Sequence, residues 1–257
     1  MLYWVLKYIL LGPLLRVLYR PKVTGLENVP ADGPVIIAIS HNSFMDSIFL
    51  PLMVKRPMTF LAKDEYFITP GFKGFWMRVF FKGVGQVPID RSGGNASEAA
   101  LRTGVRVLSG GNILGIYPEG TRSPDGKLYR GHTGVARMAL AAGAPVVPAA
   151  LKGTREVQPP NKKLPRVRKI TINIGKPLDF SRYEGMDNDR FVLRSMTDEI
   201  MYEIMQLSGQ EYSDMYANTA KKLISEREKQ AAEHPVSVDT GDQSAQDAEP
   251  DAKPIAS

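Results

Sequence analysis

The stretch Val35–Leu50, VIIAISHNSFMDSIFL, decides the fold predicted for this chain. Its first five residues are apolar and mostly β-branched, which is typical of a buried strand. Ser43 and Asp46 have the spacing of a capping box, which begins a helix through the residues that follow. The sequence therefore predicts a strand that passes directly into a helix, with His41 at the corner between them.

His41 and Asp46 are five residues apart, so they would point about 140° away from each other on one continuous helix. A strand-to-helix corner instead lets the carboxylate fold back onto the imidazole, hold one ring nitrogen and leave the other free to accept a proton. Two plainer interpretations stay open: Asp46 only caps its own helix, or His41 is a hydrogen-bonded core histidine. The chain has only three histidines, and His234 lies in a polar tail, which favours a functional His41. His132 is expected at the rim of a pocket and outside the catalytic set.

Four sequence blocks occur in a fixed order, and together they resemble the glycerolipid acyltransferase family. Within that family they look like the bacterial lysophosphatidic acid (1-acyl-sn-glycerol-3-phosphate) acyltransferases, over roughly residues 23–179. At two positions, Pro88 and Tyr117, the chain differs from the residue that is common in the family. Neither difference replaces a polar group. The blocks are HNSFMD (His41–Asp46), GQVPIDR (Gly85–Arg91), YPEGTRS (Tyr117–Ser123) and APVVPAAL (Ala144–Leu151).

The resemblance implies roles for individual residues. His41, oriented by Asp46, would deprotonate the acceptor hydroxyl, which attacks a thioester directly; the absence of any cysteine and of a G-x-S-x-G elbow agrees with this. Arg91 and Arg122 correspond to the family's phosphate-binding arginines, and a guanidinium fork suits a phosphate dianion. A solvated surface ion pair is the plainer alternative for either arginine. The predicted substrate-binding residues are Arg91, Glu119, Gly120, Thr121 and Arg122, although Glu119 could also serve only to brace its neighbouring arginine.

The predicted function is transfer of a fatty acyl group from acyl-CoA or acyl carrier protein to lysophosphatidic acid, which gives phosphatidic acid in phospholipid synthesis. Alternatives are acylation of glycerol 3-phosphate or of another lysophospholipid, thioester hydrolysis, and a catalytically silent peripheral membrane protein. No cofactor is expected. No metal site is expected either, because the sequence has neither a cysteine cluster nor an H-E-x-x-H motif.

Charge is unevenly distributed along the chain. Residues 231–257 carry a net charge of −5, so the first 230 residues carry +11 although the whole chain is only +6. A body this basic attracts nucleic acid, anionic lipid or an acidic carrier. Because no nucleic-acid motif accompanies the charge while many apolar residues do, we expect an anionic membrane surface as the partner and no nucleic acid.

Two apolar segments support a membrane partner. Residues 1–22, MLYWVLKYILLGPLLRVLYRPK, are interrupted by Lys7 and by Gly12-Pro13, so we expect an interfacial amphipathic helix and not a span. A helix that merely packs on the domain is the alternative. Residues 66–83 combine aromatic and cationic side chains and could form a membrane-facing lip. The predicted location is therefore the cytoplasmic face of a membrane, as a monotopic or peripheral protein.

Strand-like and helix-like segments alternate through the rest of the chain, which predicts an α/β fold. The family resemblance implies a mixed, largely parallel sheet flanked by helices, with the N-terminal membrane-associated helix added to it. The predicted domains are an interfacial helix (1–22), an acyltransferase domain (23–208), a C-terminal helical extension (209–230) and an acidic disordered tail (231–257).

Overall fold

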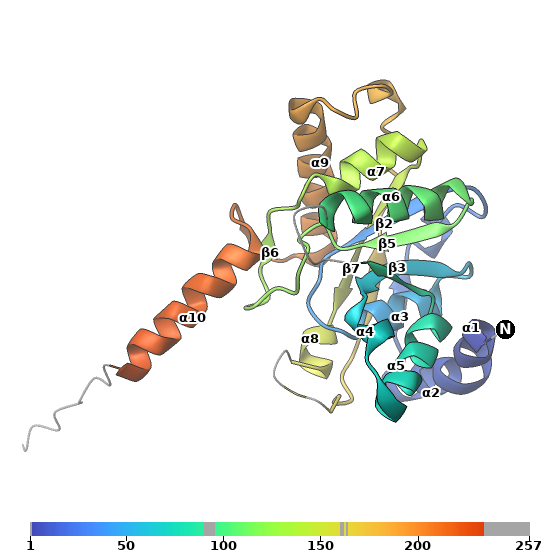
Figure 1. Ribbon diagram of the computed structural model, residues 1–257, viewed down its shortest axis with the longest axis vertical. Helices are drawn as coiled ribbons and strands as arrows, with labels where there is room; N and C mark the ends of the chain where they lie inside the picture. The colour runs from blue at the N-terminus through green and yellow to red at the C-terminus, as the bar shows by residue number, and fades with distance from the viewer. Residues whose placement is uncertain (1, 90–95, 160–161, 163, 234–257) are drawn as a thin grey trace, which may run out of the picture. The chain divides into compact units, whose positions relative to one another are not determined.

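A central seven-stranded sheet organises the computed structural model, which describes residues 2–89, 96–159, 162 and 164–233 (Figure 1). Its strand order is β1-β8-β7-β2-β5-β3-β4, and every neighbouring pair is parallel except β7 and β8. The predicted mixed, largely parallel sheet is thus confirmed. The strands are β1 (Lys22–Thr24), β2 (Val35–Ile39), β3 (Met58–Lys63), β4 (Gln86–Ile89), β5 (Ile113–Ile116), β7 (Val146–Lys152) and β8 (Thr171–Ile174).

Strand β2 lies in the middle of the sheet, between β5 and β7. All five of its residues are fully buried, because helices cover both faces of a parallel sheet. Val35, Ile37 and Ile39 pack into the core on one face, and Ile36 and Ala38 pack into the core on the other. This alternation follows from the two-residue period of a strand.

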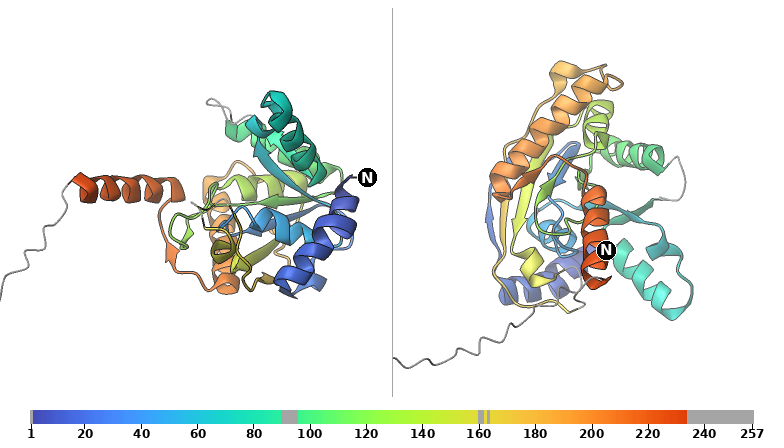
Figure 2. Two further views of the ribbon diagram at one scale, coloured as in Figure 1. Left: turned by 90° about the horizontal axis from the view of Figure 1, so that it is seen from below. Right: turned by 90° about the vertical axis from the view of Figure 1, so that its left-hand side faces the viewer.

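The helices cover the two faces of the sheet (Figures 1 and 2). Residues of α6, α7 and α9 contribute to the core that contains Ile36, and residues of α2 and α3 contribute to the core that contains Ile37. The helices are α1 (Leu2–Val5), a π-helical turn (Leu6–Leu10), α2 (Leu11–Tyr19), α3 (Asp46–Met53), α4 (Glu65–Ile68), α5 (Gly71–Gly83), α6 (Ala96–Ser109), α7 (Gly134–Ala142), α8 (Thr154–Val157), α9 (Arg190–Ser208) and α10 (Ala217–Glu233), with 3₁₀ turns at Leu26–Asn28 and Ser181–Tyr183.

The C-terminal part of the chain forms a second, smaller sheet in addition to helices. Helix α9 ends at Ser208, and Gly209 adopts the left-handed conformation (φ 66°) that commonly ends a helix. The chain then pairs β9 (Tyr212–Ser213) with β6 (Leu128–Tyr129) before α10 begins. Residues up to Lys221 belong to one compact unit, and Lys222 begins a second. The predicted tail beyond residue 233 lies outside the described residues.

The N-terminal segment is one continuous helical run from Leu2 to Tyr19, and Gly12-Pro13 lies within it. A π-helical turn precedes Gly12 and accommodates the proline within the run. By length and composition alone, this helix could cross a membrane. Two of its cations nevertheless bind the domain: Lys7 Nζ donates to the carbonyl oxygen of Val54, and Arg16 donates to that of Leu52 at 2.7 Å.

We predict that Gly115→Ala destabilises the fold. Gly115 lies in β5, and a Cβ atom there would meet the Phe60 ring at 2.5 Å and the Met58 methyl group at 2.6 Å. Overpacking of this kind costs about 1–3 kcal/mol, which urea unfolding would measure. Gly134→Ala is the matched control because open space surrounds that position in helix α7. Equal stability of the two variants would contradict the prediction.

Candidate active site

The corner between β2 and α3 brings His41 and Asp46 together. His41 Nδ1 lies 3.2 Å from Asp46 Oδ2, and the imidazole remains 17% exposed while the carboxylate is completely buried. When the ring proton is on Nδ1, this nitrogen donates a hydrogen bond to the carboxylate. The lone pair on Nε2 is then on the side of the ring away from Asp46. An imidazole held in this way can act as a general base.

The Asp46 carboxylate also organises the corner itself. Its Oδ2 atom accepts the backbone N–H groups of Asn42 and Ser43, each at 2.8 Å. The Ser43–Asp46 contact expected from the spacing is thus present, but α3 begins at Asp46 itself, and its N-cap residue Met45 makes no side-chain cap. Asp46 therefore contacts the His41 imidazole, as one interpretation of the sequence predicted, and it also binds two backbone N–H groups before the helix.

A second buried carboxylate, Glu119, joins the corner to the loop after β5. Glu119 Oε1 accepts the backbone N–H of His41 at 2.9 Å, and Oε2 accepts that of Tyr129 at 3.0 Å. Burial raises the Glu119 pKa to about 7, although these two hydrogen bonds act in the opposite direction and Asp46 and Asp125 add repulsion. Through these contacts Glu119 holds the backbone of His41 and of Tyr129, and neither contact joins it to Arg122.

The aromatic ring of Tyr117 lies against the imidazole. Their ring centroids are 3.7 Å apart and the rings are within 14° of parallel. The Tyr117 hydroxyl forms a 2.6 Å hydrogen bond with Ser47 Oγ in α3, and its ring also stacks on Phe60. Tyr117 and Ser47 were not predicted as site residues; the position of Tyr117 two residues before Glu119 was the only signal.

The turn Glu119–Arg122 is fixed close to His41 by backbone hydrogen bonds. Gly120 has φ 72°, which favours glycine, and Ser123 N–H donates to the carbonyl oxygen of His41 at 2.7 Å. Thr121 is partly buried, and Arg122 is exposed. The turn thus presents a cation beside the histidine corner. Arg91, the other predicted phosphate ligand, lies outside the described residues.

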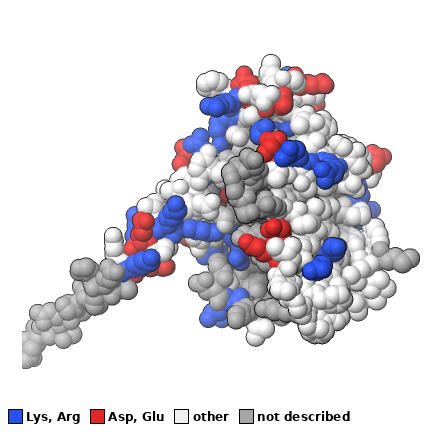
Figure 3. Space-filling view, viewed as in Figure 1, with Lys and Arg blue, Asp and Glu red and all other residues white. Residues whose placement is uncertain are grey.

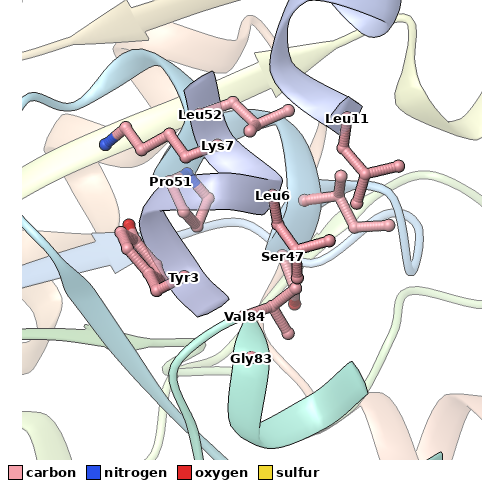
Figure 4. A pocket seen from close by; sticks show the side chains of 10 residues that line it. Tyr3, Leu6, Lys7, Leu11, Ser47, Pro51, Leu52, Gly83 and Val84 are labelled. Atoms are coloured by element: carbon pink, nitrogen blue, oxygen red, sulfur yellow. The ribbon is translucent and has the colours of Figure 1, made fainter. Parts of the chain in front are cut away.

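An apolar pocket lies between the N-terminal helix, α3 and the end of α5 (Figure 4). The N-terminal helix contributes Leu6 and Leu11 to its lining, and α3 contributes Ser47 and Leu52. Val84, the residue directly after α5, completes this part of the lining. Because Ser47 bonds to the tyrosine that stacks on the imidazole, the pocket is linked to His41 through two side chains.

These features define the class of protein. A buried carboxylate holds a partly exposed histidine, a turn that carries Arg122 lies beside this histidine, and an apolar pocket is linked to it through Tyr117 and Ser47. This combination suits an enzyme that transfers a group between a polar headgroup and a fatty chain. Within the described part of the chain, no group of three or more His, Cys, Asp or Glu side chains could hold a metal ion.

Comparison with known proteins agrees with this class. Residues 20–152 match the family model described as Acyltransferase. A 1-acyl-sn-glycerol-3-phosphate acyltransferase of Bacillus subtilis is 32% identical over 193 residues, which is 73% of this chain and 88% of that protein. The chain therefore belongs to the acyltransferase family.

Two further relatives define how far the similarity extends. The chloroplastic 1-acyl-sn-glycerol-3-phosphate acyltransferase LPAT1 of Arabidopsis thaliana is 30% identical, over 66% of this chain but only 47% of that protein. The crystal structure of the 1-acyl-sn-glycerophosphate acyltransferase of Thermotoga maritima superposes with a TM-score of 0.54 at 27% identity, covering 71% of this chain and 69% of the other. The sheet and its flanking helices are thus the fold of a known acyltransferase.

We predict that His41→Ala abolishes most of the turnover and leaves the fold intact. Loss of a general base lowers rates by about 10²–10⁴. Asp46→Asn retains an acceptor oxygen and should lower kcat less than His41→Ala does. Steady-state kinetics and thermal unfolding of purified variants would test both expectations. Near wild-type turnover in a folded His41→Ala protein would rule out the base assignment.

We also predict a pH effect from Glu119, whose folded-state pKa of about 7 exceeds the ordinary value of 4.5. The folded protein then holds this proton more tightly than the unfolded chain does, so wild-type stability falls as pH rises from about 4.5 to about 7. Glu119→Gln removes the titrating group and one acceptor of a backbone N–H. The free energy of unfolding of wild type relative to Glu119→Gln should therefore fall over this range, by at most about 3.5 kcal/mol.

Urea unfolding at pH 5, 6, 7 and 8 would measure that difference. The direction in which this stability difference changes with pH decides whether the prediction holds. A difference that stays constant with pH, or that widens towards pH 8, would show that Glu119 is ionised throughout.

Proposed function

We propose that this acyltransferase moves a fatty acyl group from a thioester donor to the free hydroxyl of lysophosphatidic acid and so produces phosphatidic acid. The observation that carries the proposal is the His41–Asp46 pair beside the cationic turn that ends in Arg122. The relatives named as 1-acyl-sn-glycerol-3-phosphate acyltransferases support the same acceptor.

The reaction needs one base and no covalent enzyme intermediate. His41 Nε2 takes the proton of the acceptor hydroxyl while the oxygen attacks the thioester carbonyl carbon. Asp46 stabilises the imidazolium that forms. The carbon–sulfur bond then breaks, and the imidazolium returns the proton to the leaving thiolate, so the products are an ester and a free thiol. Acyl-CoA and acyl carrier protein both supply such a thioester.

The two ends of the acceptor are chemically different, and the site offers a place for each. We assign the phosphate to Arg122, together with the predicted Arg91, because a guanidinium binds a phosphate dianion through two parallel hydrogen bonds. We assign a fatty chain to the apolar pocket next to Ser47, since apolar contacts stabilise each buried CH₂ by about 0.8 kcal/mol.

The surface around the N-terminal helix supports docking on a membrane. Several apolar side chains of this helix are exposed while its Lys7 is buried: Ile9 is 68% exposed and Val17 69% exposed. Helix α5 adds Phe72, 80% exposed, and Trp76, 55% exposed. Figure 3 shows this region, at the lower right where Figure 1 places α1, α2 and α5, as an almost uncharged surface. An exposed apolar face of this kind indicates an interfacial element.

The function is tested by supplying purified protein in detergent with labelled acyl-CoA and three acceptors: lysophosphatidic acid, glycerol 3-phosphate and a monoacylglycerol. We expect lysophosphatidic acid to be acylated with the highest kcat/KM. In Arg122→Lys the KM for lysophosphatidic acid should rise while the KM for acyl-CoA stays nearly unchanged. Lysine keeps the charge but cannot form the two parallel hydrogen bonds of a guanidinium group. Acyl-CoA loss that does not depend on any acceptor would identify a thioesterase and overturn the proposal.

Membrane docking predicts that the double variant Ile9→Asp/Val17→Asp moves from the vesicle pellet towards the supernatant. Burying a charged side chain in the apolar part of the membrane interface is unfavourable, so the variant should bind vesicles less tightly. Its activity on vesicles should therefore fall more than its activity on detergent-dispersed substrate. Phe191→Asp in α9 is the control, because Phe191 is 89% exposed but lies outside this surface. If both proteins sediment with vesicles like the wild type, the N-terminal helix is not the anchor.

A further inference from the structure

The start of helix α10 brings a lysine to the cationic turn of the active site. Lys221 Nζ donates a hydrogen bond to Thr121 Oγ1, and the Lys221 side chain is partly buried. Thr121 directly precedes Arg122, the predicted phosphate ligand. Lys221 lies well beyond the part of the chain, residues 20–152, that matches the family model. Its role must therefore be derived from its contacts in this chain.

Lys221 reaches this place because the chain before it is held against the loop after β5. Strand β9 pairs with β6, and Arg130 N–H donates to the carbonyl oxygen of Met215 at 3.0 Å. The Tyr216 ring then stacks on His132, with centroids 4.6 Å apart and the rings within 8° of parallel. His132 N–H in turn donates to Pro118, immediately before Glu119. These contacts hold the chain that enters α10 against the loop after β5, just over one helical turn before Lys221.

The arrangement leaves two positive charges close together. Burial lowers the pKa of Lys221, and the neighbouring Arg122 guanidinium lowers it further. Within the described ranges, neither side chain has an ion-pair partner. Glu119 is the acid close enough to raise the Lys221 pKa, but both of its oxygens already accept backbone N–H groups. Like charges that lack a counter-ion repel each other, and an anion bound between them removes that repulsion.

We propose that Lys221 is a further ligand for the acceptor's phosphate group, acting with Arg122 and the Thr121 hydroxyl. This inference rests on the proposed function for the identity of the acceptor but not for the binding of a phosphate monoester. A dianion placed here would accept hydrogen bonds from an ammonium group, a guanidinium group and a hydroxyl group. The segment that follows the acyltransferase domain thereby contributes to substrate recognition.

Lys221→Gln tests the charge, because glutamine keeps a donor for Thr121 Oγ1 but is neutral. Lys221→Arg keeps the charge, and Lys222→Gln is the control, since Lys222 is the exposed neighbour on the same helix. Calorimetry with glycerol 3-phosphate, compared with glycerol, measures phosphate binding without turnover. We expect Lys221→Gln to weaken this binding about tenfold to a hundredfold, as for loss of a charge-assisted hydrogen bond. Lys221→Arg should stay within about threefold of the wild type, and Lys222→Gln should not change.

Kinetics supply the second readout. For Lys221→Gln, the KM for lysophosphatidic acid should rise by a similar factor, with the KM for acyl-CoA and the thermal midpoint unchanged. If Lys221 only tethers α10 to Thr121, Lys221→Gln will bind glycerol 3-phosphate like the wild type, and the proposal is wrong. It is also wrong if Lys221→Gln and Lys221→Arg lose binding equally, because geometry and not charge would then be decisive.

The outcomes separate this inference from the proposed function. Wild-type protein that binds glycerol 3-phosphate through Lys221 but does not acylate lysophosphatidic acid would refute the function and retain the phosphate site. Protein that acylates lysophosphatidic acid with a phosphate affinity independent of Lys221 would retain the function and refute this inference. A wild-type protein that binds glycerol 3-phosphate no better than glycerol would refute the phosphate site altogether.

Discussion

The site depends on two buried carboxylates that bind backbone N–H groups at the corner after β2. Asp46 fixes residues 42 and 43, and Glu119 fixes the N–H of His41 from the opposite side. A buried carboxylate without such partners would cost several kcal/mol, so the corner and the two side chains stabilise each other. The imidazole therefore comes to the surface in one orientation before any substrate binds. Preorganisation of this kind is the condition for efficient proton transfer.

The N-terminal helix has an unusual distribution of polarity, because two of its cations bind the domain while several of its apolar residues are exposed. Lys7 and Arg16 donate to carbonyl oxygens at the end of α3, which leaves Ile9 and Val17 exposed. In water this arrangement would leave a large apolar surface uncovered. At a bilayer interface the same surface would become an anchor, and the helix that carries it also lines the pocket beside Ser47.

Sequence patterns predicted most of the sheet and the meeting of His41 with Asp46, because these depend on local signals: β-branched runs, a capping box and a known motif order. The second contact of Glu119, with Tyr129, could not be predicted, since it needs the loop after β5 to close on itself. The stacking of Tyr117 on the imidazole and the approach of Lys221 also depend on tertiary packing between segments far apart in sequence. The π-helical turn within the N-terminal helix was not predicted, because such a turn leaves no clear sequence signal.

In the proposed reaction the acceptor and the product share the phosphate, so contacts to that group cannot by themselves accelerate the reaction. Binding that is equally strong in the ground state and the transition state lowers KM without raising kcat. In the proposed mechanism, cations at the turn therefore decide which acceptor is used and how it lies. The rate comes from His41, whose charge changes during the reaction, and from Asp46, which stabilises the imidazolium. Strong phosphate binding would also slow the release of phosphatidic acid. A partly exposed turn, with one cation in contact with water, limits that penalty because solvent screens the attraction.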